Sequence, residues 1–109
     1  MRTQTHFLLR LYTDEAALLG DQSVVHLLMD RARQAGLLGA TVHRAQSGFG
    51  HGAHLHRGGL VDRNSPIIVE IVDVEPKVRD FWDDIADLHG IGLATLEKVE
   101  VLRGAREQE

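Results

Sequence analysis

Several short stretches of the chain are rich in apolar and β-branched residues, or place apolar residues at alternate positions, as is typical of β-strands. The clearest such stretch, residues 66–74 (PIIVEIVDV), is rich in Ile and Val, and its proline stands first, where a strand tolerates it. In residues 6–13 (HFLLRLYT), Phe7, Leu9 and Leu11 fall on one face. Four strands are therefore predicted: His6–Thr13, Ala40–Gln46, Pro66–Val74 and Leu96–Arg103.

Two further stretches repeat their apolar residues at a helical spacing. Asp21 or Ser23 can cap the first predicted helix, which runs to about Ala35. Pro76 opens the second predicted helix in its first turn, and Gly90 and Gly92 end it. The apolar stripes consist of Val24, Val25, Leu28, Ala32 and Ala35 in the first helix and of Val78, Phe81, Trp82, Ile85 and Leu88 in the second.

The order of these elements is β-α-β-β-α-β, which predicts the α+β class and a ferredoxin-like sandwich. In that fold both helices cover one face of an antiparallel four-stranded sheet. A long loop would connect the second and third strands. We expect residues 1–109 to form one such domain.

The sheet face opposite the helices is expected to be mixed in character. Its predicted residues are Leu8, Arg10, Tyr12, Ile68, Glu70, Val72 and Lys98. Such a face is too apolar to lie against water and too charged for the core of a monomer. We therefore expect the chain to self-associate through this face or through the sheet edges, whose unpaired strands need cover.

Composition narrows the functional classes. The 109 residues are 43% hydrophobic and 26% charged, which is typical of a globular chain. Cysteine is absent, which excludes disulfides, thiolate metal sites and a thiol nucleophile. The net charge of −4 argues against nucleic-acid binding. No apolar run approaches the roughly 18 residues of a membrane span, and the first residues lack the apolar core of a secretion signal, so a cytoplasmic location is expected.

A long connection lies between the second and third predicted strands. Residues 47–65 (SGFGHGAHLHRGGLVDRNS) contain five glycines, three histidines and two arginines. Connections of this length inside a compact domain are mostly functional or disordered. Two arginines against one aspartate give this segment a charge of +1, so the rest of the chain carries −5. A basic, glycine-rich segment on an acidic domain favours a small anionic ligand or an acidic partner.

Several roles are open for this segment. Its glycines let backbone N–H groups approach an anion and form a nest around it. His51, His54 and His56 form the pattern H-x-x-H-x-H, and three imidazoles could hold Zn²⁺ or Cu²⁺ with a fourth position open. The segment could also be a connection that needs glycine only in order to turn. No nucleophile elbow or suggestively placed carboxylate pair is present, so we expect a binding protein rather than an enzyme.

The same segment resembles a known family. Gly48-Phe49-Gly50, at the junction of strand and loop, resembles the G-F-G that opens the T-loop of PII signalling proteins. The run G-F-G-H-x-x-x-x-H-R, from Gly48 to Arg57, is similar to that of the PII-like proteins grouped as domain of unknown function 190. The return strand and the ending at residues 101–104 are also similar to PII sequences, so the resemblance covers nearly the whole chain.

The resemblance implies a homotrimeric signal-transduction protein that binds an adenine nucleotide or another small anionic metabolite in clefts between subunits. It also implies that residues 47–65 act as a T-loop, which changes shape and contacts a partner such as a membrane transporter, an enzyme or a regulator. The residues expected to contact the ligand are Gly48, Phe49, Gly50, His51, Gly52, His56 and Arg57.

Departures from the PII pattern limit what it implies. His51 and Gly52 stand where PII proteins carry Arg-Gln, so the glutamine that helps to hold a magnesium–oxoacid pair is absent. Residues 47–65 contain no tyrosine for uridylylation, and residues 88–92 (LHGIG) lack the phosphate-binding lysine of PII. CutA, a trimeric relative by fold, is linked to divalent metals. It keeps open the alternative of a metal-binding or metal-sensing trimer that uses the three loop histidines.

Overall fold

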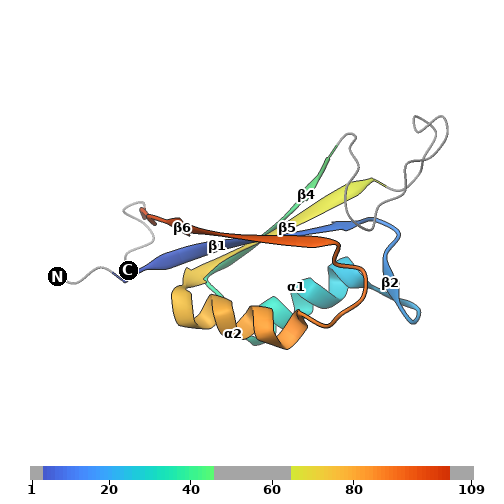
Figure 1. Ribbon diagram of the computed structural model, residues 1–109, viewed down its shortest axis with the longest axis horizontal. Helices are drawn as coiled ribbons and strands as arrows, with labels where there is room; N and C mark the ends of the chain where they lie inside the picture. Colours follow the sequence, from blue (N-terminus) through green and yellow to red (C-terminus); the bar gives the residue numbers. More distant parts are fainter. Residues whose placement is uncertain (1–3, 46–64, 104–109) are drawn as a thin grey trace.

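The computed structural model describes residues 4–45 and 65–103 as a four-stranded antiparallel sheet with two helices on one face (Figure 1). The strand order is β4-β5-β1-β6, and a two-stranded hairpin of β2 and β3 lies before the first helix. The predicted ferredoxin-like α+β fold is confirmed. The elements are β1 (His6–Asp14), β2 (Leu18–Leu19), β3 (Gln22–Ser23), α1 (Val24–Gln34), β4 (Gly39–Arg44), β5 (Pro66–Val74), α2 (Glu75–Ile85) and β6 (Leu93–Val99).

Local sequence signals explain where the helices begin. The Ser23 side chain caps α1 and accepts a hydrogen bond from the N–H of His26. Gly36 ends the turn after α1 with a φ of 70°, a conformation that glycine adopts without a Cβ clash. At α2, Glu75 and Pro76 occupy the first turn, where a carboxylate suits the helix dipole and proline lacks only an unneeded N–H.

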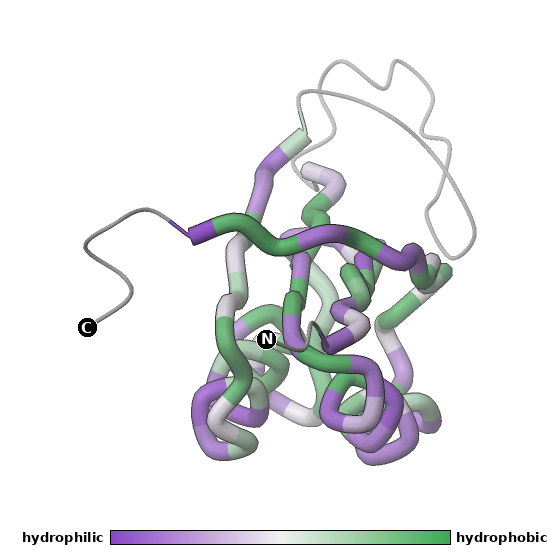
Figure 2. The backbone as a smooth tube through the Cα atoms, turned by 90° about the vertical axis from the view of Figure 1, so that its left-hand side faces the viewer, coloured by the Kyte–Doolittle hydropathy of each residue, from purple (hydrophilic) through white to green (hydrophobic). Residues whose placement is uncertain are grey.

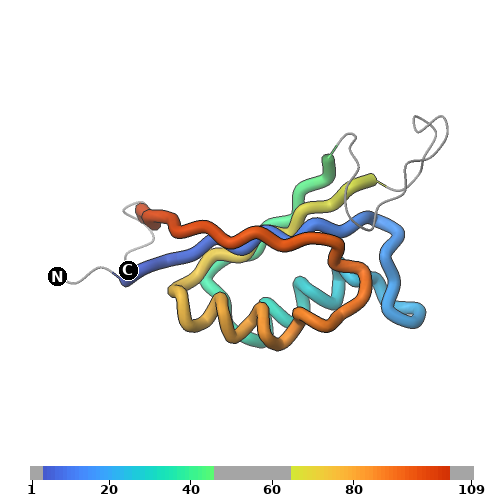
Figure 3. Tube along the Cα trace, viewed as in Figure 1, coloured from blue at the N-terminus to red at the C-terminus, as the bar shows by residue number. Residues whose placement is uncertain are grey.

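The core lies between the helices and the sheet, and its pattern follows the strands. Alternate residues of β5 are buried along its whole length. Both helices run side by side across the same face (Figures 2 and 3). Truncating one of these buried aliphatic side chains to alanine is expected to cost about 2–5 kcal/mol. The buried apolar residues are Leu9, Leu11, Val24, Leu28, Ala32, Ile67, Val69, Ile71, Val78, Phe81 and Ile85.

One buried polar residue, Asp73, links β5 to the start of β4. Its Oδ2 accepts a hydrogen bond from the N–H of Leu38 at 2.7 Å, and its Oδ1 accepts one from the N–H of Val74 at 2.6 Å. The ammonium of Lys77 lies 3.7 Å from Oδ2. Because a buried carboxylate without partners is costly, these contacts explain how Asp73 is accommodated beside the core.

The fourth strand of the sheet is displaced from its prediction. β6 begins at Leu93, three residues before the predicted start, and ends at Val99. Its pairing with β1 runs from Leu93 opposite Tyr12 to Val99 opposite His6, where β1 itself begins. Among the described residues, none pairs with residues 100–103 in a strand, so the prediction that the strand extends to Arg103 was wrong.

The shift also changes which residues share a face. Lys98 pairs with Phe7 and so lies on the helix-covered face, whereas Glu97 pairs with Leu8 on the opposite face. The prediction that Lys98 lies on the face opposite the helices was wrong, because it followed from alternation alone without the register. We call this face, which the helices leave uncovered, the open face.

The second helix is shorter than predicted. α2 ends at Ile85, and the N–H of Leu88 donates to the carbonyl oxygen of Ile85 in a turn. Leu88, beyond the end of the helix, is partly buried and packs against the core, which explains why the apolar spacing continues past Ile85. None of the helices among the described residues is long and apolar enough to cross a membrane.

Candidate functional site

The segment at residues 46–64 lies outside the part of the chain that the structure describes. The strands on either side of it are described. β4 leads into the segment and β5 leads out of it. The N–H of Ala45 donates a hydrogen bond to the carbonyl oxygen of Pro66 at 2.8 Å. The end of β1 and the turn toward β2 lie at the same end of the sheet (Figure 1).

Glu15, just after β1, contacts both of these strands. Its N–H donates to the carbonyl oxygen of Ser65 at 2.9 Å. Its carboxylate accepts hydrogen bonds from the guanidinium of Arg44 and from the N–H of Ser65. The hydrogen bond from Arg44, supported by that from Ser65, lowers the pKa of the Glu15 carboxyl below its ordinary value. Glu15 therefore joins the last residues before the segment to the first residue after it.

The connection from α2 to β6 reaches the same end of β1. The N–H of Gly92 donates to the carbonyl oxygen of Tyr12 at 2.8 Å, and the hydroxyl of Thr13 donates to the carbonyl oxygen of Gly90. Gly90 has a φ of 104°, and a Cβ built on it would lie 3.0 Å from Cγ2 of Val24. The described part of the candidate site is thus formed by the end of β1, the strand ends beside Glu15 and the glycine-containing connection before β6.

The residues that the sequence singled out for binding are not among those that the structure describes. The three histidines proposed as metal ligands, His51, His54 and His56, therefore remain a prediction. Within residues 4–45 and 65–103, no three His, Asp or Glu side chains are grouped so that they could hold a metal ion. The expected ligand-contacting residues that also remain predictions are Gly48, Phe49, Gly50, His51, Gly52, His56 and Arg57.

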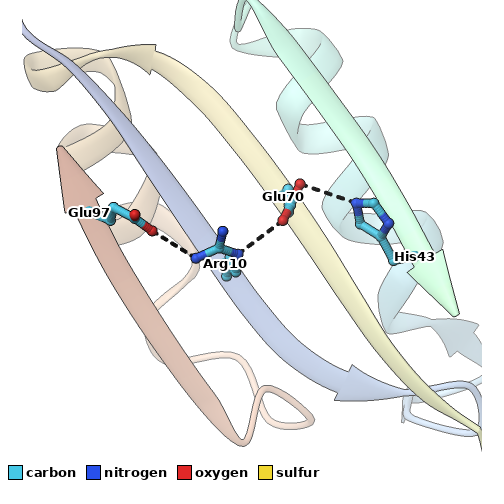
Figure 4. Close-up of polar contacts among 4 residues, drawn as sticks. All are labelled: Arg10, His43, Glu70 and Glu97. Carbon is cyan, nitrogen blue, oxygen red and sulfur yellow. Dashed lines mark hydrogen bonds and ion pairs between the residues drawn. The ribbon is translucent and has the colours of Figure 1, made fainter. Parts of the chain in front are cut away.

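A continuous row of charged and polar side chains crosses the open face, with one residue from each strand (Figure 4). Oε1 of Glu97 accepts from Nη1 of Arg10 at 2.8 Å. Nε of Arg10 donates to Oε2 of Glu70 at 2.9 Å, and Nε2 of His43 lies 3.1 Å from Oε1 of Glu70. We refer to Glu97, Arg10, Glu70 and His43 as the charge row.

The two middle residues of the charge row stabilise each other's charged forms. Burial alone would raise the pKa of the Glu70 carboxyl, but hydrogen bonds from Arg10 and His43 outweigh burial and lower it. The hydrogen bond to Glu97, and then that to Glu70, raises the pKa of the Arg10 guanidinium. Arg10 and Glu70 are therefore both ionised at neutral pH.

Apolar residues flank the charge row on both sides. Leu8 pairs with Val72, and Tyr12 pairs with Ile68, and all four are only partly buried. Leu93, opposite Tyr12 on β6, is 52% exposed. The predicted mixture of apolar and charged residues on the open face is therefore present, with Glu97 in the place of Lys98.

A surface hollow of about 250 Å³ lies on the helix side, between the end of α1 and α2. The residues that line it are Ala35, Leu37, Lys77, Asp80, Phe81 and Asp84. It lies on the opposite side of the sheet from the open face.

Three residues of these contacts were not predicted from the sequence: Glu15, Arg44 and Glu97. The contact of Glu15 with Arg44 joins residues 29 positions apart, and nothing in the local sequence marks either one. The face of Glu97 follows from the pairing of β6 with β1, in which Glu97 lies opposite Leu8 and Lys98 opposite Phe7, and the local sequence does not specify this register.

The chain matches a known family along most of its length. Residues 6–101 match the family DUF190, whose description reads "Uncharacterized ACR". The UPF0166 protein of Aquifex aeolicus (strain VF5) is 38% identical over 104 residues, which are 94% of this chain and 98% of that protein. The chain belongs to the DUF190 family. The family resemblance inferred from the run between Gly48 and Arg57 is confirmed.

Solved structures relate this DUF190 chain to the PII-like fold. CPII, a nitrogen regulatory PII-like protein from Thiomonas intermedia K12, was solved bound to ADP and bicarbonate. That structure is similar with a TM-score of 0.68 and 17% identity, covering 94% of this chain and 93% of CPII. A second CPII structure, bound to ADP, AMP and acetate, has a TM-score of 0.65 and 15% identity, covering 94% of both chains. The DUF190 chain thus has the PII-like fold.

Proposed function

We propose that this DUF190 protein is a PII-like regulatory protein that binds a small anionic metabolite, with an adenine nucleotide as the first candidate. In this proposal residues 47–65 act as a T-loop that contacts a partner protein, such as a membrane transporter, in the cytoplasm. Binding of the metabolite changes which form of this segment is populated. The ligand can do so only if it binds one form better than the other.

The observation that carries the proposal is the likeness of fold to CPII over nearly the full length of both chains. CPII structures hold ADP or AMP together with small anions. The G-F-G-H run gives further support, because it lies in the segment that would bind the anion.

The arrangement of the described residues is compatible with such a switch. Glu15, Arg44 and Ser65 join both ends of the segment to β1, and the connection before β6 contacts β1 within three residues of Glu15. A ligand that binds between these connections would contact the base of the segment directly. The proposed ligand contacts are the backbone N–H groups from Gly48 to Gly52 and the side chains of His51, His56 and Arg57.

We further propose that the protein is a homotrimer and that subunits meet over the open face. The apolar residues beside the charge row are only partly covered within one chain, and covering them would remove apolar surface from water. Assembly over this face would also bring neighbouring chains to the cleft in which the metabolite is proposed to bind.

The test is calorimetric titration of chelator-treated protein with AMP, ADP, ATP and cyclic AMP. Adenosine is the matched control ligand, because it has the base and the sugar but no phosphate. We expect micromolar binding of at least one nucleotide and much weaker binding of adenosine. If none of the four nucleotides binds, the assignment of an adenine nucleotide is wrong.

A parallel titration with Zn²⁺ alone distinguishes the metal hypothesis. Tight zinc binding without nucleotide binding, lost in a variant with His51, His54 and His56 all replaced by alanine, would favour a metal-binding protein. Imidazole ligands must be deprotonated to bind a metal, so this affinity would also fall steeply below about pH 6.

A further inference from the structure

The charge row on the open face has an uneven charge balance. It contains one arginine and two glutamates, so its net charge is −1 while His43 is neutral and zero once His43 is protonated. Arg10 already contacts both carboxylates, so His43 is the residue of the row that can still gain a positive charge by taking up a proton.

The two ends of the row are the parts most open to water. The side chains of Glu97 and His43 are 53% and 51% exposed, whereas those of Arg10 and Glu70 are 32% and 27% exposed. If another chain covers the open face, the ends lose the most solvent. An uncompensated charge is then poorly screened, because the interactions between charges strengthen as water is excluded.

Identical chains would bring identical charges together. Each copy contributes one uncompensated negative charge when its His43 is neutral, so the copies repel one another. Protonation of His43 removes this charge beside Glu70, with the hydrogen bond between the two side chains already in place (Figure 4).

We infer that self-association over the open face is coupled to proton uptake by His43, so that the assembly tightens as the pH falls from 8 to 6. This inference rests on the proposed assembly over that face. By linkage, each proton taken up on assembly strengthens association by at most about tenfold per pH unit.

The charged groups that face His43 belong to the charge row itself. Among the described residues, β4 pairs only with β5, and the charged group of β5 that faces His43 is Glu70, followed by Arg10 on β1. On β4 itself, Arg44 belongs to the opposite face and contacts Glu15. The other titratable residues of the open face lie away from the row along β1 and are His6, Tyr12 and Asp14.

Sedimentation velocity of the full chain at several concentrations, at pH 8, 7 and 6 and constant salt, tests the inference. The variant His43→Gln cannot take up a proton but retains an N–H that can donate to Glu70. We expect wild type to associate more tightly at pH 6 than at pH 8, and H43Q to associate equally at both. His6→Gln, on the same face, and His89→Gln, exposed on the helix side, are matched controls that should keep the wild-type pH dependence.

A second variant tests the charge balance without a histidine. Glu97→Gln removes one negative charge from the row and leaves the contacts between Arg10, Glu70 and His43 intact. We expect E97Q to associate more tightly than wild type at pH 8. If all chains remain assembled at the lowest concentration, the exchange rate of labelled subunits is compared instead.

Different outcomes would overturn the coupling to proton uptake and the proposed self-association over the open face. A wild-type chain that is monomeric under all conditions would overturn the proposed self-association, and the inference with it. An assembly whose strength does not depend on pH, or whose pH dependence persists in H43Q, would overturn the inference and leave the proposed assembly standing.

Discussion

Arg10 and Glu70 stand directly opposite each other on β1 and β5, and the guanidinium Nε lies 2.9 Å from the carboxylate Oε2. Opposite charges that face each other across two strands stabilise a sheet. Arg10 also contacts Glu97 on β6, and Glu70 also contacts His43 on β4. The pair therefore adds a cross-strand contact to the backbone pairing of the two middle strands on the open face.

Replacing Glu70 with alanine should destabilise the fold, because Arg10 and His43 both lose their shared acceptor. We expect the midpoint of thermal unfolding to fall on the order of 5 °C. Asp30→Ala is the matched control, since it removes an exposed contact with Arg33 three residues away on α1. If the two substitutions lower the unfolding midpoint equally, the contacts of Glu70 in the charge row contribute no more to stability than one exposed contact on a helix.

Acid should weaken the contacts of Glu15. Its pKa is lowered in the folded state, so its contribution to stability is fully present above the ordinary value of 4.5 and is lost as pH falls through the lower folded value. Glu15→Gln should therefore lose less stability than wild type between pH 6 and 3. Unfolding midpoints across this range, with Glu100→Gln as a control outside the strands, measure the difference. Parallel curves for wild type and E15Q would contradict the role assigned to Arg44.

Gly90→Ala should be destabilising by at least about 1–2 kcal/mol, because a residue with a Cβ is strained at a φ of 104°. The new Cβ would also lie 3.0 Å from Cγ2 of Val24 in the core. Gly39→Ala is the matched control, since a Cβ at position 39 would have no atom within 4 Å and the φ there is not in the left-handed range. Urea unfolding of both variants measures the change. A Gly90→Ala protein as stable as the Gly39→Ala protein would contradict the backbone argument.

Arg57→Ala should weaken binding of the proposed anionic ligand. Loss of one charge-assisted hydrogen bond is expected to reduce affinity by about tenfold or more. Calorimetry with the nucleotide that binds wild type most tightly measures the change. Arg33→Ala on α1 removes the same charge from an exposed position and should leave the affinity unchanged. Unchanged affinity in R57A would remove this residue from the proposed site.

Strong local patterns explain why much of the fold could be predicted. β5 was predicted with its observed bounds, because a run rich in Ile and Val lies between a proline and a helix start. The Ser23 cap and the glycine at position 36 likewise act within a few residues of the helix that they delimit. Such signals depend on the backbone of one short stretch, so they can be read without knowing the rest of the chain.

The candidate site was predicted less completely than the fold. The G-F-G-H run identified the family, and the chain belongs to it, but the proposed ligand contacts stay predictions because they lie in residues 46–64. Arg44 and Glu15 carried no signal, since their contact depends on how two distant strand ends meet. The alternation near residue 98 placed Lys98 on the open face, and one residue of register reversed this assignment.

Local sequence patterns were enough to establish the order of the two helices and the four strands of the main sheet, the class of fold, the family and the segment in which function should be sought, but they did not reveal the short hairpin of β2 and β3. The register of β6, the contacts of Glu15 and the charge row across four strands emerged only once the chain was folded. The reason is physical: periodicity and caps report interactions within a few residues, whereas register and cross-strand contacts depend on which distant backbones pair. Glu97, Arg10, Glu70 and His43 become one row only when four strands align.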